Sequence, residues 1–193
     1  MRPRAGELLH FSEDPSISEF HPHVAATARQ SDPYVWAVDG TQAPAYWFPR
    51  QCPRAMAWAG AGTTEADRER VLGPGGGERV HAIEYDWVRR FLSAELYAYR
   101  FAADAFHPFG GPVPHAFVAT RTVTPLGPAE PVGDLLSLYR DAGIQLRVLD
   151  DLREFWAEVV AGTLEFSGIR LANAKARHST KAVRDLAAPI QDA

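Results

Sequence analysis

The stretch AYWFPRQCPR, residues 45–54, places two arginines among large aromatic rings and two prolines. A short apolar run that ends at a proline is typical of a buried strand, so we predict a strand over 45–49. Arg50 follows directly and has two interpretations. In one, its aliphatic stem packs on the rings while the guanidinium reaches water. In the other, the guanidinium is held at the rim of a pocket, where its planar set of donors binds an anion.

Short apolar runs separated by turn residues continue on both sides of this stretch. Further strands are predicted over 7–11, 34–39, 54–59, 79–84, 95–102, 116–123 and 144–149, and a strand or helical turn over 164–172. Helices are predicted over 65–72, 85–94, 131–143 and 151–162, and residues 12–20 carry the signals of a helix start. Residues 107–115 are predicted to form a loop. Because strands and helices do not alternate strictly, the predicted fold class is α+β, with a curved, largely antiparallel sheet and about four short helices.

The composition is typical of one globular domain, which we place over 1–172, followed by a polar, flexible C-terminal tail over 173–193. The net charge of −4 argues against a sequence-independent nucleic-acid binder, because such proteins carry a basic excess. The single cysteine excludes an internal disulfide and suits a reducing compartment. No apolar run approaches the ~20 residues of a membrane span, and no signal-peptide pattern is present. We therefore expect a cytoplasmic protein with no membrane partner.

Histidine and cysteine residues raise the hypothesis of a metal site. His21 and His23 flank a proline, and His10, Cys52 or His81 offers a further ligating atom. Their spacing matches no zinc signature, and the proline between the two histidines indicates an irregular loop. We therefore expect no metal.

Cys52 is also a candidate nucleophile. It lies between Arg50 and Arg54, and neighbouring positive charges lower the pKa of a thiol. A dyad of Cys52 with one of the seven histidines is therefore one hypothesis. The other is that Cys52 is a small buried residue within an aromatic stretch.

Three polar residues are candidates for ligand binding. His10 and Ser12 are two apart on a predicted strand, so they point to the same face and can hold an amide or a sugar hydroxyl. Glu130 lies between two prolines just before a predicted helix. It is either a charged turn residue near a helix N-terminus or a carboxylate fixed at the edge of a pocket.

The segments LLHFSEDPSISEFHPHV, APAYWFPRQCPR, VHAIE and EPVGDLL, in that order, resemble a small bacterial family of uncharacterised proteins over roughly residues 8–172. A more remote resemblance is to the ADP-ribosyltransferases of the DNA-targeting toxin type. Those proteins open with a strand of the form L-x-H followed by a small residue, and they carry an aromatic strand F-Y-F-x-P-R-x-P. The stretch AYWFPRQCP is similar, with one more residue between its arginine and its second proline.

The second resemblance implies a split-sheet fold and NAD as substrate. By that resemblance, His10 contacts the nicotinamide end of NAD. On chemical grounds, Ser12 can hold the ribose and Tyr46 can cover the nicotinamide ring. Arg50 is implied as a functional residue that binds the pyrophosphate, and Glu130 as the catalytic carboxylate, although Pro131 replaces the apolar residue expected after it.

This chemistry is physically coherent. A guanidinium binds a phosphate through two parallel hydrogen bonds, and a carboxylate stabilises the positive charge that develops on ribose when nicotinamide leaves. The expected function is therefore an NAD-binding, ADP-ribosyltransferase-like protein that transfers ADP-ribose or hydrolyses NAD. The alternative is a non-catalytic domain that binds a small ligand or a partner.

Overall fold

The computed structural model describes residues 1–24, 31–74, 77–111 and 114–175. Within these ranges the α-helices are α1 (Glu65–Val71), α2 (Tyr85–Leu92), α3 (Leu135–Asp141) and α4 (Leu152–Ala161). The strands are β1 (Glu7–Ser12), β2 (Val35–Ala37), β3 (Arg54–Trp58), β4 (Arg79–Glu84), β5 (Tyr97–Ala102), β6 (His107–Phe109), β7 (Ala116–Ala119), β8 (Glu130–Pro131), β9 (Ile144–Leu149) and β10 (Glu165–Ile169). Short 3-10 helices are η1 (Ala43–Tyr46), η2 (Ala103–Ala105) and η3 (Leu171–Asn173).

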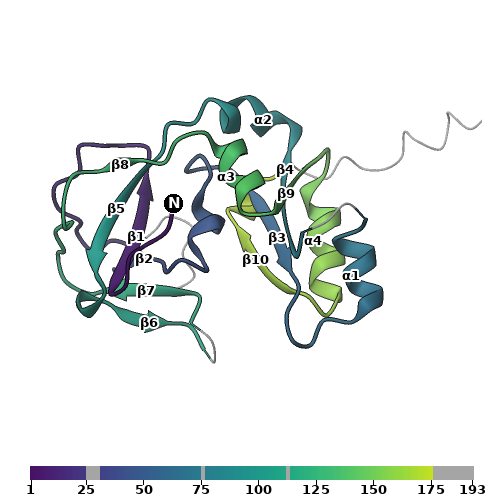
Figure 1. Cartoon of the computed structure of the whole chain (residues 1–193), viewed down its shortest axis with the longest axis horizontal. Helices are drawn as coiled ribbons and strands as arrows, with labels where there is room; N and C mark the ends of the chain where they lie inside the picture. The colour runs from purple at the N-terminus through teal and green to yellow at the C-terminus, as the bar shows by residue number, and fades with distance from the viewer. Residues whose placement is uncertain (25–30, 75–76, 112–113, 176–193) are drawn as a thin grey trace, which may run out of the picture.

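The strands form three sheets, in the orders β1-β5-β8, β2-β7-β6 and β10-β3-β4-β9. Every pairing is antiparallel except that of β4 with β9. The first two sheets meet where Leu9 and Val38 exchange backbone hydrogen bonds of 2.8 Å. Figure 1 shows these two sheets on one side of the molecule and the four-stranded sheet with its helices on the other. The predicted α+β class with largely antiparallel sheets is confirmed.

Local signals fixed the helices well. Thr64 caps α1 by accepting a hydrogen bond from the backbone N–H of Asp67, and Asp151 caps α4 through the N–H of Arg153. The α4 helix then buries Leu152, Phe155 and Val159 on β3 and β4, in a cluster with alanines and valines of those strands. None of the helices in the described ranges is long and apolar enough to cross a membrane.

The predicted strand over 45–49 is wrong. Residues 43–46 form the 3-10 helix η1, which has a proline in its first turn, and an irregular segment follows. Pro44, Pro49 and Pro53 remove three backbone donors that a central strand needs, so the segment folds on itself instead. The expectation of burial was nevertheless right, since Trp47 and Phe48 are almost completely buried.

The predicted helix start over 12–20 is also wrong. Asp14 accepts a hydrogen bond from the backbone N–H of Ser16 at 2.8 Å, which closes a local turn rather than a helix. The hydroxyl of Tyr99 donates to the Asp14 carbonyl at 2.6 Å and accepts from the N–H of Ile17 at 3.0 Å. These contacts fasten the segment in an irregular path across β5.

Two other predictions differ in part from the structure. The predicted loop over 107–115 begins with β6, which pairs with β7, and residues 112–113 of it lie outside the described residues. Most of the predicted tail, from residue 176 onward, also lies outside them. Residues 173–175 are described and make specific contacts, which bear on the site below.

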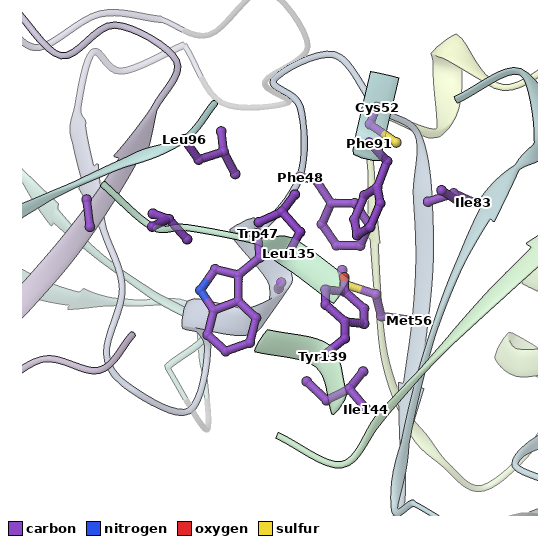
Figure 2. Packing of buried hydrophobic residues seen from close by; sticks show 13 residues of the cluster. Trp47, Phe48, Cys52, Met56, Ile83, Phe91, Leu96, Leu135, Tyr139 and Ile144 are labelled. Atoms are coloured by element: carbon purple, nitrogen blue, oxygen red, sulfur yellow. The ribbon is translucent and has the colours of Figure 1, made fainter. Parts of the chain in front are cut away.

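The segment between β2 and β3 lies between the two sides of the molecule (Figure 1) and supplies the centre of the core. Phe48 packs against Phe91 at 5.5 Å and against Tyr139 at 5.8 Å between ring centroids. The same cluster contains Ala98 of β5 and Met56 of β3, so it joins strands of both sides. Figure 2 shows this packing around the aromatic rings.

Candidate functional site

The two arginines of residues 45–54 have opposite environments. Arg54 is 4% exposed, and its guanidinium lies 4.9 Å from the centre of the Phe48 ring. Its Nε donates to the Ala45 carbonyl at 2.9 Å, and its Nη1 donates to the Cys52 carbonyl at 3.0 Å. One planar side chain thereby fixes both ends of the segment 45–52. The interpretation that an arginine packs among the rings thus describes Arg54.

Arg50, by contrast, is exposed at the tip of a tight turn. The N–H of Cys52 donates to the Pro49 carbonyl at 2.9 Å, so Arg50 and Gln51 are the central residues of the turn. The Arg50 guanidinium makes no hydrogen bond or ion pair with any of the described residues. Arg50 is therefore presented on a fixed backbone with all its side-chain donors available.

Two contacts from distant parts of the chain hold this turn. The amide nitrogen of Asn173 donates to the Gln51 carbonyl at 2.9 Å. The carboxylate of Glu13 accepts the backbone N–H of Arg50 in a long hydrogen bond of 3.4 Å. The second contact brings the turn beside the end of β1, where Ser12 is the last residue of the strand.

His10 lies on β1 in a defined protonation state. Its Nδ1 lies 2.8 Å from the Trp36 carbonyl, and because a carbonyl only accepts, Nδ1 carries the proton. Burial lowers the pKa of His10 below its usual value, and the nearby positive charge of Arg50 lowers it further. The neutral ring therefore keeps Nε2 as a hydrogen-bond acceptor. The ring also makes an edge contact with Phe20 at 4.8 Å.

Ser12 shares a face of the sheet with His10, as predicted. Across the strand pairing, His10 faces Tyr99 and Ser12 faces Tyr97. The Ser12 hydroxyl accepts the backbone N–H of Asp14 at 3.1 Å, so its own proton remains available to a ligand. We call His10, Ser12 and Arg50 the rim site, because they gather where β1 ends and the 49–52 turn begins.

Glu130 is not part of the rim site. It is paired with Ala98, which in turn is paired with Phe11, and directly paired residues point to the same face of a sheet. Since Phe11 and His10 are neighbours on β1, Glu130 lies on the face opposite to His10 and Ser12. A sequence reading could not foresee this, because the register of β8 depends on a pairing between residues more than 30 positions apart.

The Glu130 carboxylate is already engaged on that face. Its two oxygens accept from Nε and Nη2 of Arg100 at 2.8 and 3.0 Å, and Nη1 of Arg100 donates to Glu7 at 2.8 Å. The hydrogen bond from Arg100 lowers the pKa of Glu130. We call Glu7, Arg100 and Glu130 the charge network. The catalytic role expected for Glu130 is thus without geometric support.

Tyr46 also lies away from His10. Its ring packs beside the cluster of Leu9, Val38 and Ala43, and Leu9 points to the face of β1 opposite to His10. Burial raises the pKa of its hydroxyl. Its expected contact with nicotinamide is replaced by packing in the core.

The alternative based on Cys52 loses support. Cys52 is completely buried, and burial raises the pKa of its thiol to about 12, so it is neither accessible nor ionised at neutral pH. The structure fits the interpretation of Cys52 as a small buried residue within an aromatic stretch. Among the described residues, no group of three or more metal-ligating side chains comes together.

Sequence reasoning missed three residues that build the rim site: Glu13, Arg54 and Asn173. Arg54 carried a signal, since an arginine beside aromatic residues in an apolar stretch is a candidate for a buried clamp. Glu13 and Asn173 carried none, because each acts on the turn from far away in the sequence. Chemically, the rim site offers an acceptor nitrogen and a hydroxyl on one face of β1, and a guanidinium near enough for its charge to act on His10.

The chain belongs to the family of unknown function DUF6886, which it matches over residues 9–174. The match includes every residue of the rim site. No curated protein and no solved structure matches the chain. The family description assigns no activity.

Proposed function

We propose that this protein binds NAD at the rim site and belongs functionally with the ADP-ribosyltransferases, as a transferase or an NAD hydrolase. One observation carries the proposal. A neutral imidazole with a free acceptor nitrogen and a guanidinium without a partner among the described residues lie close enough for Arg50 to influence the pKa of His10. The resemblance of residues 45–53 to the toxin-type transferases supports the same ligand.

The groups match the parts of NAD. Nε2 of His10 accepts a hydrogen bond from an amide N–H, such as the carboxamide of nicotinamide. Ser12 donates to a ribose hydroxyl, and the exposed fork of Arg50 binds a pyrophosphate oxygen pair. A ligand with only one kind of polar group would use one of these three side chains, whereas a dinucleotide has a partner for each of them.

Catalysis needs a carboxylate beside the nicotinamide ribose, because positive charge develops on that sugar as nicotinamide leaves. Glu130 lies on the other face of the sheet. Glu13 is the carboxylate that reaches the rim site, through the N–H of Arg50. In a catalytic protein, Glu13 is therefore our candidate for stabilising the charged ribose.

A second candidate function is a non-catalytic module that binds the dinucleotide or another small ligand at the same place. The engagement of Glu130 by Arg100 favours it, since the carboxylate implied by the toxin-type pattern is tied up in an ion pair. Both candidate functions involve binding of the dinucleotide, and only the enzyme would also cleave it.

Thermal unfolding with and without millimolar NAD tests the shared claim. A ligand at a hundredfold excess over its Kd adds about 2.7 kcal/mol to the free energy of unfolding. We expect a clear upward shift for the wild type and a much smaller one for Arg50→Lys, because a point charge does not reproduce the fork. No shift in the wild type contradicts NAD binding.

Release of free nicotinamide separates the two candidates. An enzyme releases nicotinamide with or without an acceptor, and Glu13→Gln should abolish the release while the NAD-dependent thermal shift remains. A wild type that binds NAD and releases no nicotinamide, with cell extract as the acceptor source, is a binding module.

A further inference from the structure

A hollow with a volume of about 450 Å³ lies away from the rim site, between residues 2–5 and the 39–41 turn. We call it the N-terminal pocket. One of its walls is fixed by Arg100, whose Nη1 donates to the Arg2 carbonyl at 3.2 Å. Arg100 lies on the face of the sheet opposite to His10. The N-terminal pocket is therefore separate from the rim site.

The walls of the pocket are built rather than loosely apposed. The backbone N–H of Arg4 donates to the Glu7 carboxylate at 3.0 Å, and the N–H of Glu7 donates to the Arg4 carbonyl at 3.1 Å. Gly40 lets the 39–41 turn approach the N-terminal segment, since a Cβ there would lie 3.3 Å from the ring of Pro3. Both walls are thus held before any ligand arrives.

Positive charge dominates one side of the pocket. Arg2 lines it and has no side-chain partner among the described residues, and Arg4, whose side chain is 74% exposed, has a distant partner in Glu7 at 3.7 Å. Arg79 lies behind the wall, where its Nη1 donates to the Thr41 carbonyl at 3.2 Å. Its Nη2 is buried without a partner, and no carboxylate among the described residues contacts it. Nε of Arg79 donates to Nε2 of His81 at 2.7 Å, and the guanidinium lies 4.4 Å from the centre of the Trp58 ring, so the positive charge that lines the pocket itself comes from Arg2 and Arg4.

The other side offers a carboxylate with one oxygen in use. Oδ1 of Asp39 accepts the backbone N–H groups of Thr41 and Gln42 at 3.0 and 2.8 Å. Oδ2 has no partner among the described residues. A carboxylate fixed in this way accepts hydrogen bonds from hydroxyl groups, as acidic residues do with sugars in nucleotide sites. A simple anion would be repelled by Asp39, whereas a ligand with an anionic end and a hydroxylated end fits both sides.

We propose that the N-terminal pocket binds a small phosphorylated sugar, with the phosphate on Arg2 and Arg4 and a sugar hydroxyl on Oδ2 of Asp39. The hollow is open to solvent, and the two arginines and Asp39 all line it. The proposal uses no residue of the rim site and does not depend on NAD binding.

Calorimetric titration with ribose 5-phosphate, inorganic phosphate and ribose tests the proposal on the full chain. Ribose 5-phosphate should bind the wild type more tightly than either fragment. The double variant Arg2→Ala/Arg4→Ala should weaken its binding by at least about tenfold, because two charged hydrogen-bond donors are lost. The double variant Arg89→Ala/Arg90→Ala on α2 removes the same charge elsewhere and should leave the affinity unchanged.

Asp39→Asn sharpens the test, because the asparagine oxygen still accepts from the two backbone N–H groups, while an amide nitrogen, which only donates, replaces Oδ2. It should weaken the binding of ribose 5-phosphate and not that of inorganic phosphate. Equal affinities for ribose 5-phosphate and phosphate would overturn the sugar assignment. Full affinity in Arg2→Ala/Arg4→Ala, no binding to the wild type, or loss of binding in Arg50→Ala would overturn the pocket itself.

Discussion

The two faces of the β1-β5-β8 sheet carry polar groups in different states. On one face, the charge network pairs every carboxylate: Arg100 binds Glu130 through two hydrogen bonds and Glu7 through a third. On the other, within the part of the chain that the structure describes, Nε2 of His10 and the guanidinium of the nearby Arg50 make no hydrogen bond. Polar groups that satisfy one another stabilise the fold, whereas polar groups held in place without partners are available to a ligand. This difference directs the functional search toward the rim site.

The largest effect is expected where the rim site is anchored. Arg54→Ala leaves the carbonyls of Ala45 and Cys52 without their buried donor and opens a cavity beside Phe48. We expect a loss of about 3 kcal/mol in the free energy of unfolding, measured with urea. Arg50→Ala, in the same segment, is the matched control and should lie within about 0.5 kcal/mol of the wild type. Equal losses in the two variants would contradict the division of roles.

The charge network should contribute less than Arg54 to the free energy of unfolding, because its members are partly exposed to water. Arg100→Ala leaves Glu7 and Glu130 without their shared cation, and we expect a loss of about 2 kcal/mol in the free energy of unfolding. Arg140→Ala is the control, since its pair with Asp141 is exposed on both sides and is worth about 0.5 kcal/mol or less. A cost for Arg100→Ala no larger than for Arg140→Ala would mean that the network does not stabilise the fold.

Binding at the rim site should depend on the protonation of His10. Its pKa is lowered from 6.5, so the ring is neutral at pH 7 and Nε2 accepts a hydrogen bond. The affinity for NAD should be constant above pH 6.5 and should fall as the pH drops through the lower folded-state value. His10→Ala should weaken binding about tenfold, near 1.4 kcal/mol, and should remove this pH dependence. The control is His21→Ala, because His21 is exposed and its ring is hydrogen-bonded to the hydroxyl of Thr122. This variant should change neither the affinity for NAD nor its pH dependence.

Acid should weaken the charge network and thereby lower the free energy of unfolding by a small amount. Arg100 lowers the pKa of Glu130 below its usual 4.5, so the stabilisation is complete above that pH and is lost as the pH falls through the folded-state pKa. Glu130→Gln should cost about 0.5 kcal/mol at pH 7, because the carboxylate is partly exposed. As the pH falls from 7 through the folded-state pKa of Glu130, the free energy of unfolding should decrease less in the variant than in the wild type. Parallel stability curves would show that Glu130 is not paired in solution.

Local chemistry made part of the fold predictable. The strand over 79–84 and the helix over 65–72 are decided within a few residues, and both were predicted correctly. Residues 45–49 were not, because an apolar run is equally consistent with a strand and with a buried irregular segment. The helix expected over 12–20 failed because the hydroxyl of Tyr99, which is 82 positions from Ile17, holds the segment in another path.

In the candidate site too, features set by local sequence were predictable and features set by distant contacts were not. The shared face of His10 and Ser12 follows from the period of a strand and was predictable. The positions of Glu130 and Tyr46 depend on how distant segments pair and pack, and one residue of register moves a side chain to the other face of a sheet. The contacts of Glu13 and Asn173 with the 49–52 turn link residues 37 and 122 positions apart, which no local pattern reports.

The central claim is that NAD binds the face of His10 and not the face of Glu130. The most direct test is the dissociation constant for NAD, measured by calorimetry for the wild type, Arg50→Ala and Glu130→Gln under the same salt conditions. We predict that Arg50→Ala weakens binding at least about tenfold, because a charged pair of hydrogen bonds is lost, while Glu130→Gln binds like the wild type. Wild-type affinity in Arg50→Ala together with loss of affinity in Glu130→Gln would contradict the account.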